Sequence, residues 1–205
     1  AMPQDVLATT VVGSYPQPDW LVDRAMLARG VPRVRMQAMW RVPEPLLEQA
    51  QDDATLVAIR DMERAGIDII SDGEVGKLGF GLAYYGKRFS GLESRQVKPG
   101  EPGWMSMRTG ERLEFADFYS TLPWPTPTER VIVTGAITYI GQAEVQRDVE
   151  LFQASLAAAG VSPEESFMCV LAPGWLEHFF FNEHYANDED YLFALADAIR
   201  HEYKA

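Results

Sequence analysis

A short β-branched run, Ile67–Ile70, constrains the fold more than any other feature of the chain. A helical pattern ends at Gly66 directly before it, and the run itself predicts a buried strand. It stops at Ser71-Asp72-Gly73-Glu74, so Asp72 and Glu74 follow the carboxyl end of a strand. Two interpretations are open, because α/β barrels keep their chemistry at this position whereas Asp-Gly is also ordinary in plain turns.

Strand and helix patterns alternate along the rest of the chain. Alternation of this kind favours an α/β fold in which a parallel sheet has helices outside it. The predicted strands are Leu7–Val12, Ile67–Ile70, Arg130–Tyr139 and Ser166–Leu171, and the predicted helices are Asp19–Arg29, Leu46–Ala65, Ala143–Ala159 and Asn187–Tyr203.

The number of strand–helix units predicts half of a closed barrel. Such a barrel needs eight units and typically about 250 residues, whereas about four units are visible in these 205 residues. We therefore expect residues 1–205 to be the N-terminal half of a single barrel domain. The strands Leu7–Val12 and Phe167–Leu171 would otherwise expose open edges, so we expect the second half of the barrel, or association through those edges, to cover them.

Composition excludes several classes of function. The net charge of −12 argues against a nucleic-acid partner. No apolar run is long enough to span a membrane, and no signal-peptide pattern is visible. The single cysteine, Cys169, cannot form an intrachain disulfide, which agrees with a reducing compartment. These observations predict a cytoplasmic protein without a membrane partner.

No metal site or catalytic motif is visible in the sequence. His178, His184, His201 and Cys169 lack the spacing of zinc ligands, so we predict no metal ligand in this chain. There is also no nucleophile elbow, phosphate-binding loop or dinucleotide fingerprint, and we predict no catalytic residue here. Cys169 lies within a predicted strand, where we expect a buried small hydrophobic residue.

The predicted strand ends are the remaining candidates for a site. They include Gly13-Ser14, Asp72-Gly73-Glu74 and Thr138-Tyr139, which would meet at one rim of a barrel. Glu74 would pair with a ligand ammonium group, and Ser14 would hydrogen-bond a ligand carboxylate. The pattern therefore predicts a site for an amino acid, with a plain turn as the alternative at each position.

Four stretches of the chain also carry a resemblance to a known family. They are Thr9–Pro16 with its Gly-Ser-Tyr-Pro turn, Ala65–Glu74 with its Gly-Glu end, Val133–Tyr139 with Thr-Gly-Ala-Ile-Thr, and Asn182–Tyr203. Together they resemble the catalytic barrel of cobalamin-independent methionine synthase, and in particular its short, single-barrel relatives. Ala136 stands where this family usually has proline.

The resemblance implies a (β/α)₈ barrel of the TIM type and a 5-methyltetrahydropteroyltriglutamate–homocysteine S-methyltransferase activity. Such an enzyme transfers a methyl group from 5-methyltetrahydrofolate to the thiol of homocysteine. In the family, the residues matching Gly13, Ser14 and Glu74 hold the amino acid. We add Asp72, from its strand end, and Tyr139, which either contacts a pterin-like methyl donor or packs inside the fold.

Zinc is the cofactor that the resemblance implies, since it activates the homocysteine thiol. The family's zinc ligands lie on later strands, so we expect them beyond residue 205 and expect this half alone to be inactive. Two alternatives stay open. One is a related thiol alkyltransferase that uses a substrate such as coenzyme M, and the other is a half-barrel that binds a ligand without catalysis.

Overall fold

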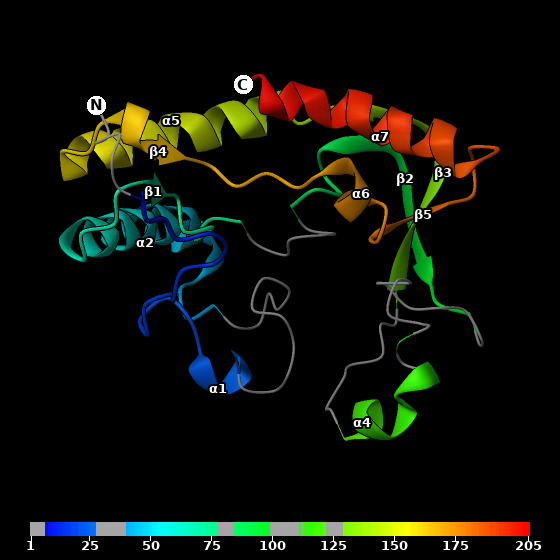
Figure 1. Ribbon diagram of the computed structural model, residues 1–205, viewed down its shortest axis with the longest axis horizontal. Helices are drawn as coiled ribbons and strands as arrows, with labels where there is room; N and C mark the ends of the chain where they lie inside the picture. The colour runs from blue at the N-terminus through cyan, green and yellow to red at the C-terminus, as the bar shows by residue number, and fades with distance from the viewer. Residues whose placement is uncertain (1–6, 28–39, 78–83, 99–110, 112, 122–128) are drawn as a thin grey trace. The chain divides into compact units, whose positions relative to one another are not determined.

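The structure is a computed structural model that describes residues 7–27, 40–77, 84–98, 111, 113–121 and 129–205 (Figure 1). Its mixture of helices and β-strands confirms the predicted α/β class. The chain divides into two compact units. The first comprises Ala1–Met26, Met36–Leu78 and Val145–Val170, and the second comprises Leu27–Arg35, Gly79–Glu144 and Leu171–Ala205.

The first unit is built on a short parallel β-ladder. Strand β1 (Ile70–Ser71) pairs in parallel with β4 (Ser166–Phe167), and a parallel bridge from Thr10 to Ile69 brings the N-terminal segment alongside β1. The helical elements are α1 (Arg24–Leu27), α2 (Glu44–Arg64), the turn η3 (Pro163–Glu165) and most of α5 (Gln142–Ala159).

Helices α2 and α5 confirm two of the sequence predictions to within two residues at each end. Helix α2 begins after Pro43, and Gly66 follows its last turn with φ +76°, a conformation that favours glycine at a helix end. An ion pair of 2.6 Å between Arg147 on α5 and Glu48 on α2 joins the two helices. The buried face of α2 consists of Leu47, Ala50, Gln51, Ala54, Thr55, Ala58, Ile59 and Met62.

The second unit contains a three-stranded sheet in the order β2–β3–β5. Strand β2 (Phe89–Gln96) is antiparallel to β3 (Glu129–Tyr139), and β3 is parallel to β5 (Phe180–Asn182). A bulge interrupts the first pairing at Gly91, where φ is +78° and a Cβ would lie 2.6 Å from the carbonyl oxygen of Ala136. Only glycine permits this approach.

Helix α7 (Asp188–Tyr203) packs on β3 in the same unit (Figure 1). Asn187, the first residue of the predicted helix, is its N-cap and accepts a 2.9 Å hydrogen bond from the backbone N–H of Asp190. Leu195 and Ile199 are fully buried on its inner face. Two short helices, α4 (Ala116–Ser120) and α6 (Pro173–Leu176), complete the unit.

Four predicted elements are shorter in the structure. The strand predicted over Ile67–Ile70 is reduced to β1 at Ile70–Ser71 and the bridge at Ile69. The strand predicted over Leu7–Val12 is reduced to the bridge at Thr10, and in this single chain Leu7 is 94% exposed. The strand predicted over Ser166–Leu171 ends at Phe167. The helix predicted over Asp19–Arg29 is α1 alone, and residues 28–29 lie outside the described residues.

The strands β2 and β5 were not predicted from the sequence. Within the described ranges the strands form two separate open sheets and do not close a barrel. None of the helices in these ranges is both long and apolar enough to cross a lipid bilayer.

Candidate functional site

Hydrogen bonds hold the ends of the first two predicted strands side by side in the first unit. At one end, the backbone N–H and the hydroxyl of Thr9 both donate to Asp68 Oδ2 at 2.8 Å. At the other end, the N–H of Tyr15 donates to the carbonyl oxygen of Gly73 at 2.8 Å. The two polar turns that follow these strands are therefore neighbours, as the sequence predicted.

Ser14 and Glu74 meet at this junction. The Ser14 hydroxyl donates to Glu74 Oε2 at 2.9 Å. Glu74 is buried, at 7% exposure, whereas Ser14 lies at the surface of this chain. In the described part of the chain no hydrogen bond is made to Glu74 Oε1. One oxygen of a nearly buried carboxylate is thus held by the protein, and the other is available to a hydrogen-bond donor.

The backbone of the turn fixes the direction of the Glu74 side chain. Glu74 has a φ of +54°, which costs an L-residue about 1–2 kcal/mol and is held in place by its surroundings. Its N–H donates to Asp72 Oδ1 at 3.2 Å, and its carbonyl accepts from the N–H of Lys77 at 3.1 Å. Gly73 has a φ of +60°, and a Cβ there would lie 2.8 Å from the Cβ of Tyr15.

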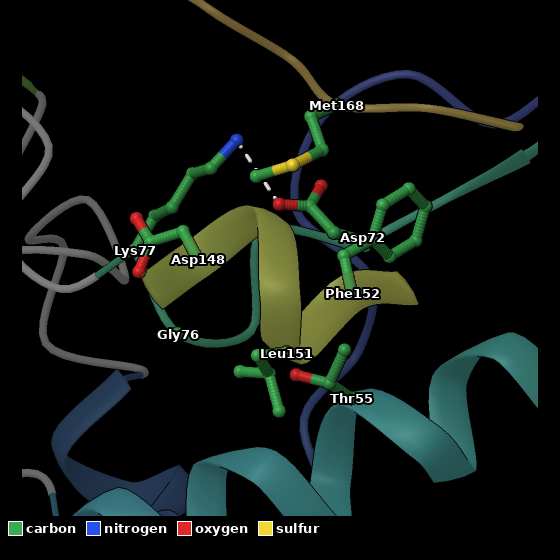
Figure 2. Close-up of a pocket in the computed structure, with 8 residues that line it drawn as sticks. All are labelled: Thr55, Asp72, Gly76, Lys77, Asp148, Leu151, Phe152 and Met168. Atoms are coloured by element: carbon green, nitrogen blue, oxygen red, sulfur yellow. Dashed lines mark ion pairs between the residues drawn. The ribbon is translucent and has the colours of Figure 1, made fainter. Parts of the chain in front are cut away.

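Lys77 is a functional candidate that the sequence analysis missed. Its ammonium group lies 3.0 Å from Asp72 Oδ2, and both side chains are nearly buried. The same ammonium group donates to the carbonyl oxygen of Cys169. Figure 2 shows this ion pair, with Met168 beside it. The position of Lys77 three residues after Glu74 was the only signal available in the sequence.

Asp72 therefore has partners within the protein at both carboxylate oxygens, since Oδ1 accepts from Glu74 and Oδ2 pairs with Lys77. The predicted contact between Asp72 and a substrate stays a prediction. What the geometry establishes is that Asp72 supports the turn on which Glu74 stands.

Cys169 lies next to this site rather than within a strand. It is half-buried and follows β4. Burial raises the pKa of the Cys169 thiol, while a hydrogen bond from the Gly13 backbone and the charge of Lys77 oppose the rise. The carboxylates of Glu74 and Asp72 add to the rise. The thiol is thus near the predicted residues Gly13, Asp72 and Glu74, which sequence spacing did not indicate.

Tyr139 belongs to the second unit, and its side chain has partners there. Its hydroxyl donates to Glu202 Oε2 at 2.6 Å, and Glu202 Oε1 pairs with Arg88 at 2.8 Å. Burial, together with the hydrogen bond to Glu202, raises the pKa of Tyr139 well above its usual value. The structure brings Gly13, Ser14, Asp72 and Glu74 together in the first unit, and the contact predicted for Tyr139 stays a prediction.

The described residues do not fit a zinc site. No group of three or more His, Cys, Asp or Glu side chains in these ranges is arranged to hold a metal ion. At the junction itself, the Asp72 carboxylate is paired with Lys77, and one oxygen of Glu74 is bound by Ser14.

Comparisons with known proteins agree with the resemblance seen in the sequence. No protein-family model matches the chain. The methionine synthase of Sulfolobus acidocaldarius is 26% identical over 97% of this chain and 48% of its own length. That of Pyrococcus furiosus is 38% identical over 72 residues, which cover 35% of this chain and 19% of the archaeal protein.

A solved structure of a B12-independent methionine synthase from Shewanella sp. W3-18-1, in complex with selenomethionine, matches with a TM-score of 0.62 and 18% identity. The match covers 97% of this chain and 47% of that one. The predicted resemblance to methionine synthases is confirmed, and the structural match supports the α/β fold. The chain spans about half the length of the archaeal relatives that it matches along its whole length.

Proposed function

We propose that this chain is the N-terminal half of a (β/α)₈ barrel that transfers a methyl group from 5-methyltetrahydrofolate to the thiol of homocysteine. The observation that carries the proposal is the contact between Ser14 and Glu74, at adjacent strand ends in a chain whose relatives are methionine synthases. In this proposal residues 1–205 supply the part of the site that binds the amino acid.

The chemistry of the junction suits an amino acid. The available oxygen of Glu74 accepts a hydrogen bond from the ligand ammonium, which is a charge-assisted contact. Ser14 has a single hydroxyl proton, which the Glu74 carboxylate accepts in this structure. A ligand ammonium that also reaches Glu74 Oε2 replaces the Ser14 proton there, and the Ser14 hydroxyl then becomes free to donate to the ligand carboxylate.

The same geometry disfavours the coenzyme M alternative. Coenzyme M is a thiol that carries a sulfonate and no ammonium group, so the buried carboxylate of Glu74 would repel it. A ligand with a positive group next to its negative one suits this site better. We therefore favour homocysteine as the thiol substrate over coenzyme M.

Three further parts of the proposal concern the whole protein. Bound zinc would supply deprotonation of the homocysteine thiol, and its ligands stay predicted beyond residue 205. The second half of the barrel would cover the exposed Leu7 and Val12, and this half alone would not catalyse. A cytoplasmic location is likewise part of the proposal.

Calorimetry on the full-length protein tests the proposal with two ligands, homocysteine and 4-sulfanylbutanoate, which lacks the amino group. Glu74→Gln removes the charge that holds the ammonium, so homocysteine affinity should fall about 10- to 100-fold. The affinity for 4-sulfanylbutanoate should not fall. Glu63→Gln, on the exposed face of α2, is the matched control and should leave the affinities for both ligands unchanged. Unchanged homocysteine affinity in Glu74→Gln would refute the proposal.

A further inference from the structure

The Glu74 turn carries two carboxylates and one cation. Lys77 lies 3.0 Å from Asp72, whereas the Glu74 carboxylate accepts a hydrogen bond from the neutral hydroxyl of Ser14. All three charged side chains are at least nine-tenths buried. Their charges sum to −1, and this single negative charge resides on the carboxylate that has an available oxygen.

Apolar side chains lie beside the ion pair. Leu151, Phe152 and Met168 line the same pocket as Asp72 and Lys77, and Figure 2 shows the ion pair with Met168 and Phe152 beside it. Charges in such an apolar environment act on one another more strongly than they do in water.

One further carboxylate, that of Asp148 on α5, lines this pocket. Asp148 lies 3.4 Å from the guanidinium group of Arg147, which also pairs with Glu48 at 2.6 Å. Lys77 is the cation that pairs directly with a carboxylate of the Glu74 turn.

We infer that Lys77 is a specificity-determining residue, which neutralises Asp72 so that the site selects a zwitterionic amino-acid thiol over an aminothiol that lacks a carboxylate. This inference rests on the proposed function. Without Lys77 the site would carry two negative charges, which repel a ligand carboxylate while attracting an ammonium. With Lys77 but without Asp72, the net charge of the site would be zero. The site would then prefer the zwitterionic amino acid over the aminothiol more strongly.

The Cys169 thiol reports the same balance of charges independently of any ligand. Lys77 lowers the pKa of this thiol, whereas Glu74 and Asp72 raise it. All three charged groups therefore act on one point beside Gly13, where the proposed ligand would lie.

The test compares the affinities of the full-length protein for L-homocysteine and for 3-aminopropane-1-thiol, which is homocysteine without its carboxylate. We expect Lys77→Met to lower the ratio of homocysteine affinity to aminothiol affinity about tenfold. Asp72→Asn should raise this ratio, and the double variant Asp72→Asn/Lys77→Met should restore it. Lys77→Arg keeps the charge and should keep the ratio. Arg60→Met, which removes a cation bonded to the Ala158 carbonyl, is the control.

The outcomes separate this inference from the proposed function. If Lys77→Met lowers both affinities equally, or neither, Lys77 has only a structural role or none, and the inference fails while the function stands. If the wild-type protein does not bind homocysteine, the proposed function fails first. Lys77→Met leaves the buried Asp72 carboxylate unpaired, which destabilises the fold. The double variant Asp72→Asn/Lys77→Met leaves no such charge. A ratio in the double variant that differs from the wild-type ratio would also overturn the inference.

Discussion

The hydroxyl of Ser14 lies 2.9 Å from Glu74 Oε2, although the two residues are 60 positions apart in the chain. The contact depends on the alignment of two segments, which the bonds between Thr9 and Asp68 fix at the other end. The binding site therefore depends on the pairing of the first two predicted strands as much as on the residues that touch a ligand.

Substitution of Ser14 tests this dependence. Ser14→Ala removes the hydrogen bond to a charged carboxylate, and such bonds contribute about 1.5–3 kcal/mol. In our proposal Ser14 gives up this bond to donate to the ligand carboxylate, so the two bonds offset each other in part. We therefore expect homocysteine affinity to fall about threefold to tenfold, as measured by calorimetry. Ser94→Ala, on an exposed position of β2, is the matched control. Equal affinities in Ser14→Ala and wild type would contradict the assignment.

Two glycines with similar backbone angles should respond differently to alanine. Gly66 and Gly73 both have positive φ, so each substitution incurs the cost of a left-handed conformation, about 1–2 kcal/mol. Only at Gly73 would the new Cβ meet another atom, the Cβ of Tyr15 at 2.8 Å, whereas Gly66 faces open space. We expect urea unfolding to show that Gly73→Ala lowers the free energy of unfolding by about 1–3 kcal/mol more than Gly66→Ala does. Equal losses would show that the turn relaxes freely.

The helices and the site residues were predictable to different degrees. The bounds of α2, α5 and α7 followed from apolar periodicity and from end signals such as Gly66, Gly160 and the Asn187 cap. These signals act on residues that are close together in the sequence, so the helices form where the signals predict them.

The strands and the ion pair were less predictable because they depend on distant partners. Strand β2 has only Phe89 fully buried along its length, so it lacks the apolar pattern that reveals a strand. Lys77 pairs with Asp72 and also donates to the carbonyl of Cys169. The second contact forms only because the segment that follows β4 lies next to the Glu74 turn in the folded chain. The predicted strand ends suggested Ser14 and Glu74 as candidates, whereas nothing in the sequence indicated the segment around Cys169.

The second unit depends on a buried charge cluster. Arg88 and Glu202 lie 2.8 Å apart, both almost fully buried, and Tyr139 donates to the same carboxylate. Removal of one partner leaves the other charge unpaired, which typically costs about 3–5 kcal/mol. We expect Arg88→Met to destabilise the protein by this amount in urea unfolding. The exposed pair Arg200–Asp197 is the control, since Asp197→Asn should cost less than about 1 kcal/mol.

A double variant separates packing from charge in this cluster. Arg88→Met/Glu202→Leu removes both charges, and it should be more stable than Arg88→Met alone, since no unpaired buried charge remains. A double variant that is less stable than Arg88→Met would instead show that the pair itself supplies most of the stability.

Alkylation of Cys169 provides a pH-dependent test of the site. Burial raises the pKa of its thiol, and only the thiolate reacts, so the rate of modification by iodoacetamide should rise at higher pH in the folded protein than in urea. Lys77→Met removes a charge that lowers this pKa and should move the rate profile to still higher pH, whereas Glu74→Gln should move it lower. Peptide mass spectrometry measures the rate at Cys169 specifically. Two results would show that these charges do not surround the thiol. In the first, the alkylation rate of the folded protein rises at the same pH as in urea or at a lower pH. In the second, both variants shift the rate profile in the same direction.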